Sequence, residues 1–120
     1  MRKLLIVLLF ATPAFAQEEP TTHAAAPTAT VTWQDMSANE TGFLIERQCT
    51  GEAAFVEVGR VGANVVTFVN TLDASALGGK TCAYRAAAFN ASGQSAYSNV
   101  DSCVVPAAVL EAPQNLRVAQ

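Results

Sequence analysis

Few residues of this chain could carry out chemistry. Its only histidine, His23, precedes the patterned part of the sequence, so no ordered Ser/His/Asp or Cys/His arrangement can be built around it. Glu46 and Glu57 fall on neighbouring expected strands and could approach each other like the two carboxylates of a glycosidase. The stronger interpretation is two solvated carboxylates on an outer sheet face, beside Arg47 and Arg60. With no CxxC or HxxxH pattern either, the sequence predicts no enzyme, no cofactor and no metal site.

Three cysteines, Cys49, Cys82 and Cys103, are the remaining reactive groups. The last two flank an expected hairpin whose loop, NASGQS, centres between Ser92 and Gly93. An antiparallel register about that centre places Cys82 opposite Cys103, where a disulfide can form and would add about 3 kcal/mol by closing a loop of about 20 residues. On these grounds the sequence favours a Cys82–Cys103 bond. Cys49 is then either a thiol available for an intermolecular bridge or a half-buried small side chain.

Short segments of alternating apolar and polar residues would position these groups. They predict six strands bounded by glycine, proline and polar loops, at residues 29–33, 43–46, 55–58, 65–69, 82–88 and 97–105. The segment DASALGGK, residues 73–80, is expected to be a loop. Residues on the inward positions of these strands would form the core: Trp33, Phe43, Ile45, Tyr84, Ala86 and Ala88. For Phe89 and Tyr97, nearer the hairpin edge, both packing and ligand stacking stay open.

Four fragments of the chain occur in a characteristic order: Trp33, ETGFLIER at 40–47, CAYRAAAFN at 82–90 and SAYSN at 95–99. That order resembles a fibronectin type III domain, which is an immunoglobulin-like sandwich of two β-sheets. The resemblance covers residues 28–105 and implies an all-β fold of six strands, without the family's first strand and with a candidate seventh strand in the C-terminal tail. It also makes the strand that ends at Cys49 a neighbour of the strand that begins at Cys82, so Cys49–Cys82 is the alternative disulfide.

Residues 1–16 are typical of a secretory signal peptide. Arg2 and Lys3 precede an apolar run at 4–10, and Ala14–Ala16 matches the small-residue cleavage pattern. The apolar run is too short for a membrane span, which needs about 20 residues. Cleavage after Ala16 would leave a flexible leader at 17–27 on a protein that is secreted, or periplasmic in a Gram-negative host. Its formal net charge would change from −3 to −5, which argues against nucleic-acid binding.

The segment after the sandwich, residues 106–120, is a linker followed by PQNLRV, which resembles the opening strand of a fibronectin type III domain. It could begin a second domain, dock on its own sandwich, or complete the sandwich of a neighbouring molecule by strand addition through Leu116 and Val118. Folding back on its own domain would make it parallel to the strand at 29–33, whereas entry into a neighbour gives the antiparallel direction. Burying the two side chains contributes about 1.5 to 3 kcal/mol each. Because association costs about 4 to 15 kcal/mol, one short strand is marginal on its own.

These patterns predict a secreted, noncatalytic binding or spacer module with a protein or polysaccharide partner of unidentified kind. The alternatives are a structural subunit that assembles head to tail through residues 113–119, and a fragment of a larger multidomain carbohydrate-active or adhesive protein. Fold analogy carries this prediction, and a fold does not by itself define a function.

Overall fold

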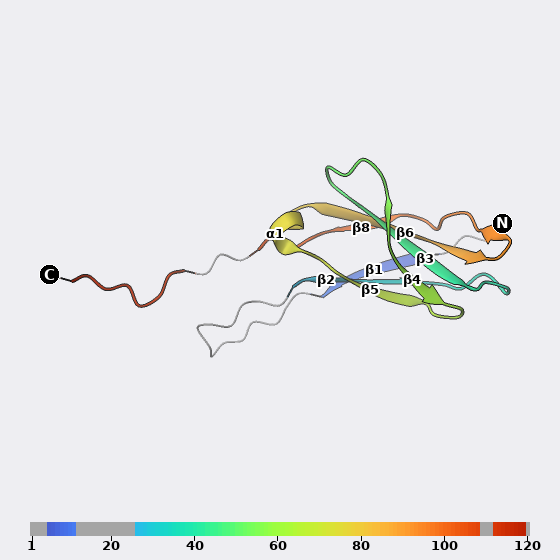
Figure 1. The fold of residues 1–120 in the computed structure, drawn as a ribbon, viewed down its shortest axis with the longest axis horizontal. Helices are drawn as coiled ribbons and strands as arrows, with labels where there is room; N and C mark the ends of the chain where they lie inside the picture. The colour runs from blue at the N-terminus through green and yellow to red at the C-terminus, as the bar shows by residue number, and fades with distance from the viewer. Residues whose placement is uncertain (1–4, 12–25, 109–111, 120) are drawn as a thin grey trace.

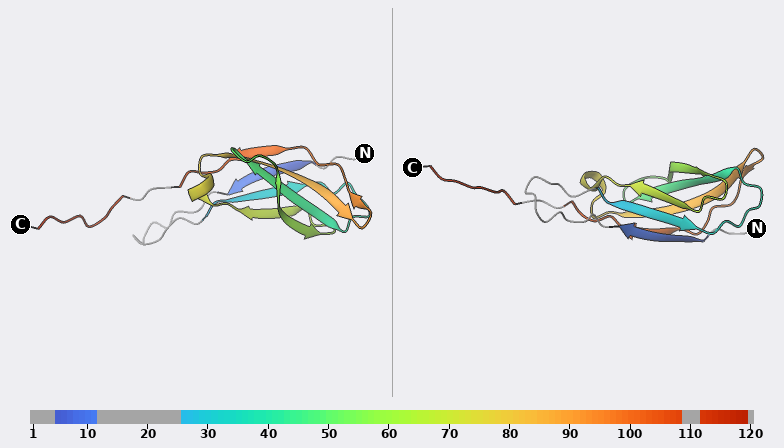
Figure 2. Two further views of the ribbon diagram at one scale, coloured as in Figure 1. Left: turned by 45° about the horizontal axis from the view of Figure 1, so that its top comes forward. Right: turned by 90° about the horizontal axis from the view of Figure 1, so that it is seen from below.

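The computed structural model describes residues 5–11, 26–108 and 112–119. Within these ranges the chain forms two antiparallel sheets packed face to face, with a single short helix (Figures 1 and 2). The expected all-β, two-sheet sandwich is confirmed. The predicted cleavage site and most of the leader, including His23, lie outside the described residues.

The first sheet has three strands in the order β1-β2-β5: β1 is Ile6–Ala11, β2 is Thr28–Trp33 and β5 is Thr67–Thr71. The second sheet has five: β3 is Gly42–Cys49, β4 is Val56–Gly62, β6 is Thr81–Asn90, β7 is Gly93–Gln94 and β8 is Asp101–Val104. Its strands run in the order β4-β3-β6, and both β7 and β8 pair with β6.

One helical turn, α1 (Ala74–Leu77), lies where the sequence predicts only a loop. The Asp73 side chain accepts a hydrogen bond from the Ser75 backbone N–H at 2.9 Å, which caps the turn. Gly78 and Gly79, on which the prediction of a loop rests, follow the helix. They end it, because Gly79 takes a positive φ of 79°. The expected loop is therefore wrong over these four residues.

The prediction of a missing first strand is wrong for the full-length chain. β1 comes from the apolar part of the expected signal peptide and pairs antiparallel with β2, from Ile6 opposite Trp33 to Ala11 opposite Thr28. Ile6 is only 3% exposed and belongs to the core, while Val7, the next residue, is exposed. An apolar run can supply inward residues at every second position, so the edge of β2 accepts it.

The core lies between the two sheets. Every residue that the sequence assigns to it is buried, namely Trp33, Phe43, Ile45, Tyr84, Ala86 and Ala88. The rings of Trp33 and Phe43 meet across the sandwich with their centroids 5.5 Å apart and their planes inclined by 55°. Such tilted aromatic pairs contribute about 0.5 to 1.5 kcal/mol beyond the burial of their area. Leu72 and Val105, which follow β5 and β8, close the end of the core near α1.

The hairpin after β6 is tighter than the sequence predicts. Asn90 pairs with Gly93, so its turn centres one residue earlier than expected, and Gly93 takes a φ of 140°. Residues 95–100 then run irregularly and shift the register, so that β8 resumes with Cys82 opposite Cys103. The predicted register at the cysteines is therefore confirmed, although a different turn produces it.

Two serines hold the irregular segment 95–100 against β6. Ser95 and Ser98 each donate a backbone N–H to β6, to the carbonyls of Ala88 at 2.8 Å and Ala86 at 2.7 Å. Their hydroxyl oxygens accept the backbone N–H groups of the same two alanines, both at 2.9 Å. The side chains thus replace the backbone acceptors that a regular strand would have supplied.

Removing the Ser98 hydroxyl should destabilise the domain. Ser98 is 7% exposed, so Ser98→Ala leaves the buried Ala86 N–H without its acceptor. We expect a loss of about 1 to 3 kcal/mol in the free energy of unfolding, measured by urea titration. Ser102→Ala is the matched control because Ser102 is exposed on β8, and its loss should stay within about 0.5 kcal/mol. Equal losses in the two variants would contradict this role of Ser98.

Candidate functional site

The outer face of the five-stranded sheet carries a compact cluster of charged and aromatic side chains. Tyr84 and Ala86 of β6 point into the core, so Arg85 between them points outward. Its guanidinium lies 3.7 Å from the ring centroid of Tyr97 and 4.1 Å from that of Phe55. Segments distant in the sequence, before β4 and after β7, therefore place two aromatic rings on one arginine of β6.

Glu46 fixes that arginine from the neighbouring strand. Arg85 Nη2 lies 2.7 Å from Glu46 Oε1, and Arg85 Nε donates to the same oxygen at 2.8 Å. The Tyr97 hydroxyl donates to the other carboxylate oxygen at 3.2 Å. All four side chains are partly buried, which strengthens charge-assisted hydrogen bonds relative to fully exposed ones. We call these four residues, Glu46, Phe55, Arg85 and Tyr97, the Arg85 cluster.

A second arginine stack lies on the same sheet. Arg60 lies 4.7 Å from the ring centroid of Phe89 and forms a bidentate pair with Glu57, at 2.9 and 3.0 Å. The hydrogen bond from Arg60 holds the pKa of the Glu57 carboxyl below its ordinary value. Glu46 and Glu57 are register partners on β3 and β4, yet each carboxylate binds its own arginine.

Between the two stacks the outer face has an apolar floor. Leu44 and Ala87 are register partners on β3 and β6 and are buried, although they do not belong to the core cluster between the sheets. Phe89 also borders an open hollow of about 270 Å³, lined among others by Ser37, Asn39, Glu40 and Gln94. The face thus combines rigid aromatic rings, fixed charges and a polar hollow, which are the groups that protein and sugar surfaces contact.

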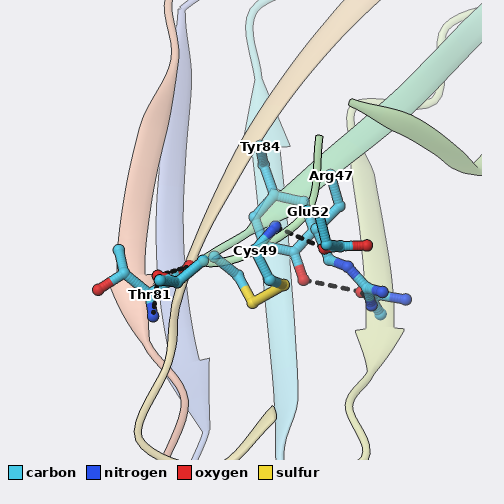
Figure 3. The surroundings of a disulfide bond; sticks show 8 residues. Arg47, Cys49, Glu52, Thr81 and Tyr84 are labelled. Atoms are coloured by element: carbon cyan, nitrogen blue, oxygen red, sulfur yellow. Dashed lines mark hydrogen bonds between the residues drawn. A yellow bond between two sulfur atoms is a disulfide. The ribbon is translucent and has the colours of Figure 1, made fainter. Parts of the chain in front are cut away.

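The disulfide lies at the end of the core, where β3 and β6 are paired. It joins Cys49 and Cys82, which are register partners and are both buried (Figure 3). Glu52 reaches back with its carboxylate to accept the Cys49 backbone N–H at 2.6 Å. Thr50 donates its N–H to the Thr81 carbonyl at 2.9 Å. The bond and these contacts tie the β3–β4 turn to the start of β6.

The favoured Cys82–Cys103 pairing is therefore corrected to the alternative, Cys49–Cys82, and Cys103 carries the free thiol. Cys82 lies on the middle strand of three, and its register partners on both sides are cysteines. The strand register alone therefore could not show whether Cys49 or Cys103 is bonded to Cys82. Burial raises the pKa of the Cys103 thiol to about 12, with Asp101 adding to the shift, so this cysteine is a poor nucleophile at neutral pH.

Partly buried polar side chains join the two sheets next to the disulfide. Asn70 on β5 accepts hydrogen bonds from the Tyr84 hydroxyl at 2.7 Å and from Arg47 Nη1 at 3.1 Å, so it joins the two sheets. Burial raises the pKa of Tyr84 to about 12, although the nearby Arg47 opposes the shift. Arg47 Nε is buried without a hydrogen-bond partner among the described residues. Arg47 does not lie with Glu46 on the outer face, because it shares the inward parity of Phe43 and Ile45.

The candidate donor residues of the tail lie away from the rest of the molecule. Leu116 and Val118 are 88% and 86% exposed, and residues 112–119 extend beyond the α1 end of the sandwich (Figure 1). The described residues contain no cluster of His, Cys, Asp and Glu able to hold a metal ion. No helix within the described ranges is long and apolar enough to span a membrane.

The sequence pattern predicts the core of this region but not the cluster on its surface. The Arg85 cluster joins a strand residue to Phe55 and Tyr97, which lie outside the regular strands, so no periodic pattern connects them. The inward position of Arg47 could have been found, because it continues the alternation of β3.

Comparisons with known proteins support the fold. No protein-family model and no curated protein matches the sequence. Among solved structures, the chain is similar to a "Myokine structure", with a TM-score of 0.52 and 21% identity over 66% of this chain and 82% of the other. It is also similar to the twitchin kinase region of C. elegans, a multidomain segment written Fn31-NL-kin-CRD-Ig26. That match has a TM-score of 0.53 and 16% identity over 81% of this chain and 16% of the other. At these identities the likeness shows a fibronectin type III-like fold.

Removing the disulfide should cost much of the domain's stability. The bond closes a loop with a sequence separation of 33, so replacing Cys49 and Cys82 with alanine should lower the free energy of unfolding by about 3 to 4 kcal/mol. Urea titration would measure the loss. Cys103→Ala is the control and should cost about 1 kcal/mol or less, because it leaves the bond intact. Peptide mapping that finds Cys82 bonded to Cys103 would refute the assignment.

The raised pKa of Tyr84 predicts a loss of stability in alkali. An unfolded tyrosine titrates near pH 10, whereas the folded chain holds this proton up to about pH 12. Its contribution is therefore complete below pH 10 and is lost as the pH rises towards 12, by about 1 to 3 kcal/mol. The measurement should be made in a Cys103→Ala protein, because the pKa of Cys103 is raised as well and its titration would overlap that of Tyr84. In that protein, Tyr84→Phe should reduce the loss of unfolding free energy between pH 10 and pH 12. If the loss is unchanged, a group other than Tyr84 causes it.

Proposed function

We propose that this protein is a secreted, noncatalytic binding or spacer module that contacts its partner through the outer face of the five-stranded sheet. The observation that carries the proposal is the Arg85 cluster, in which a strand arginine lies against two aromatic rings and pairs with a carboxylate. These side chains are already fixed by one another, so binding would cost little conformational entropy. Aromatic and arginine side chains in such settings dominate binding energy at protein surfaces.

Secretion is supported by two independent features. The N-terminal sequence has the basic, apolar and small-residue regions of a signal peptide. The fold also contains a buried disulfide, a bond that persists mainly in oxidising compartments outside the cytosol.

The geometry of the carboxylates supports a noncatalytic role. A glycosidase pair needs one carboxyl group poised to donate a proton and another free to attack or activate water. Glu46 accepts one hydrogen bond from Arg85 and one from Tyr97 and forms an ion pair with Arg85, and Glu57 is paired bidentately with Arg60. The hydrogen bond from Arg60 lowers the pKa of Glu57 and so favours its ionised form, while both oxygens of Glu46 are engaged by Arg85 and Tyr97. Carboxylates held in this way suit recognition better than proton transfer.

Binding should be tested with the purified secreted protein on arrays of polysaccharides and extracellular proteins. Tyr97→Ala should weaken binding to any partner found by at least about tenfold, because it removes a ring and a hydrogen bond from the cluster. Val69→Ala, on the other sheet and exposed, is the control and should leave affinity unchanged. A partner that binds both variants like the parent would place the binding surface elsewhere.

Secretion and cleavage of the N-terminal segment can be tested separately from binding. Expression of the full gene in a secreting host should release a chain whose N-terminal residue is Gln17, determined by intact mass and N-terminal sequencing. A chain that is released with residues 1–16 attached, or is retained in the cytosol, would contradict the proposal.

A second candidate function is a structural subunit that assembles head to tail. The exposed tail with Leu116 and Val118 favours it, because a segment that pairs with no strand among the described residues can add to an open sheet edge. A fragment of a larger adhesive or carbohydrate-active protein is the remaining alternative, and a downstream domain encoded in the same gene would support it.

A further inference from the structure

Residues 6–11 form a strand in the structure, and the sequence predicts that the same residues belong to a signal peptide. β1 supplies an edge strand of the sandwich, and it lies within the segment whose removal the proposed secretion requires. Removing residues 1–16 takes away all six register pairs between β1 and β2. The secreted form of the domain would therefore have an open slot along β2, which we call the β1 slot.

The contacts of β1 define what the slot can accept. Ile6 is 3% exposed in the core cluster, and Leu8 packs against that cluster, while Val7 between them is 50% exposed. The slot thus takes two apolar side chains two residues apart, with an outward residue between them. Its backbone partners are also fixed: the Ile6 N–H donates to Asn99 Oδ1 at 2.8 Å, and the Leu5 carbonyl accepts the Gln34 N–H at 3.2 Å.

The tail repeats this pattern. Leu116, Arg117 and Val118 place two apolar side chains around an outward charged one, in the order of Ile6, Val7 and Leu8. The alternative register, two residues further along, would put Gln114 in the almost fully buried position of Ile6, where an amide group would lack water. Leu116 therefore matches Ile6, and Arg117 falls opposite Thr32, as Val7 does in β1.

Direction distinguishes between a tail from the same chain and one from a second copy. β1 begins beside Asn99 and ends opposite Thr28, at the α1 end of the sandwich, and the tail leaves the sandwich at that same end (Figures 1 and 2). Entering its own slot directly would make the tail run parallel to β2, against the antiparallel pairing of β1. Entering in the direction of β1 would require it first to run back about 20 Å along the sandwich. A second copy displaced along the long axis presents the start of its slot to the tail.

We infer that, in the secreted protein, residues 114–119 of one molecule fill the β1 slot of a second copy of this chain. The inference rests on the proposed secretion, because β1 fills the slot in any chain that keeps residues 1–16. Each molecule would offer one tail and one slot at opposite ends, so the contact is heterologous and builds linear chains. The assembly is a structural role for a segment that the monomer leaves in solvent.

The first test is the oligomeric state of residues 17–120, produced behind a heterologous leader that is cleaved to leave Gln17. This design separates the inference from the native cleavage that tests secretion. Size-exclusion chromatography with light scattering should show a mass that rises with concentration in multiples of the monomer. Leu116→Asp with Val118→Asp should restore the monomer, whereas Arg117→Ala, on the outward position, should leave assembly intact. A monomer at every concentration would overturn the inference.

The second test fixes the register and the partner. Two chains carrying Cys103→Ser, one with Thr32→Cys and the other with Arg117→Cys, are mixed and oxidised. We expect a disulfide-linked heterodimer on a non-reducing gel, because these positions face each other as Val7 and Thr32 do. Thr30→Cys, two residues out of register, is the matched control and should give at least tenfold less.

A tail docked on its own molecule would give a different result. The mixture would contain no heterodimer, while a single chain carrying both Thr32→Cys and Arg117→Cys would form an internal bond and run as a monomer. That outcome would overturn the assignment of the occupant to a second copy. Equal yields from Thr30→Cys and Thr32→Cys would overturn the proposed register.

Discussion

The structure depends on the pairing of β3 with β6. Their register runs unbroken from Gly42 opposite Phe89 to Cys49 opposite Cys82, so the inward residues of both strands form one continuous wall of the core. The opposite side of the same pair bears Glu46 and Arg85, whose ion pair orders the outer surface. Shifting this register by one residue would exchange the two faces and move the arginine cluster into the core.

The disulfide and the partly buried polar contacts of Arg47 act on the same pair of strands. Cys49–Cys82 fixes the end of the register covalently, and the Arg47–Asn70–Tyr84 contacts connect that end to the facing sheet. An unsatisfied polar group in such a position is costly, and the Arg47 Nε–H has no partner among the described residues. The apolar contacts and the covalent bond around it must offset that cost.

Alternation in the sequence was sufficient to predict strands and the core residues, because a half-buried strand must place every second side chain inside. It identified Trp33, Phe43 and Tyr84 for that reason. The two-sheet arrangement came from the resemblance to a fibronectin type III domain. Alternation could not choose between two cysteines that flank Cys82 in equally good register. It also missed β1, because a segment typical of a signal peptide gives no sign that it can pair with Thr28–Trp33. The Arg85 cluster could not be predicted from the sequence, because Phe55 and Tyr97 reach it from irregular segments that follow no periodic pattern.

The two serines of segment 95–100 protect one edge of the five-stranded sheet against pairing with other molecules. The Ser95 hydroxyl donates to the Ala96 carbonyl, and the Ser98 hydroxyl to the Asn99 carbonyl, so two backbone acceptors at this border of the sheet are already occupied locally. A foreign strand would find neither a straight backbone nor a full row of free carbonyls there. Sideways growth into amyloid-like ribbons is thereby discouraged at this border.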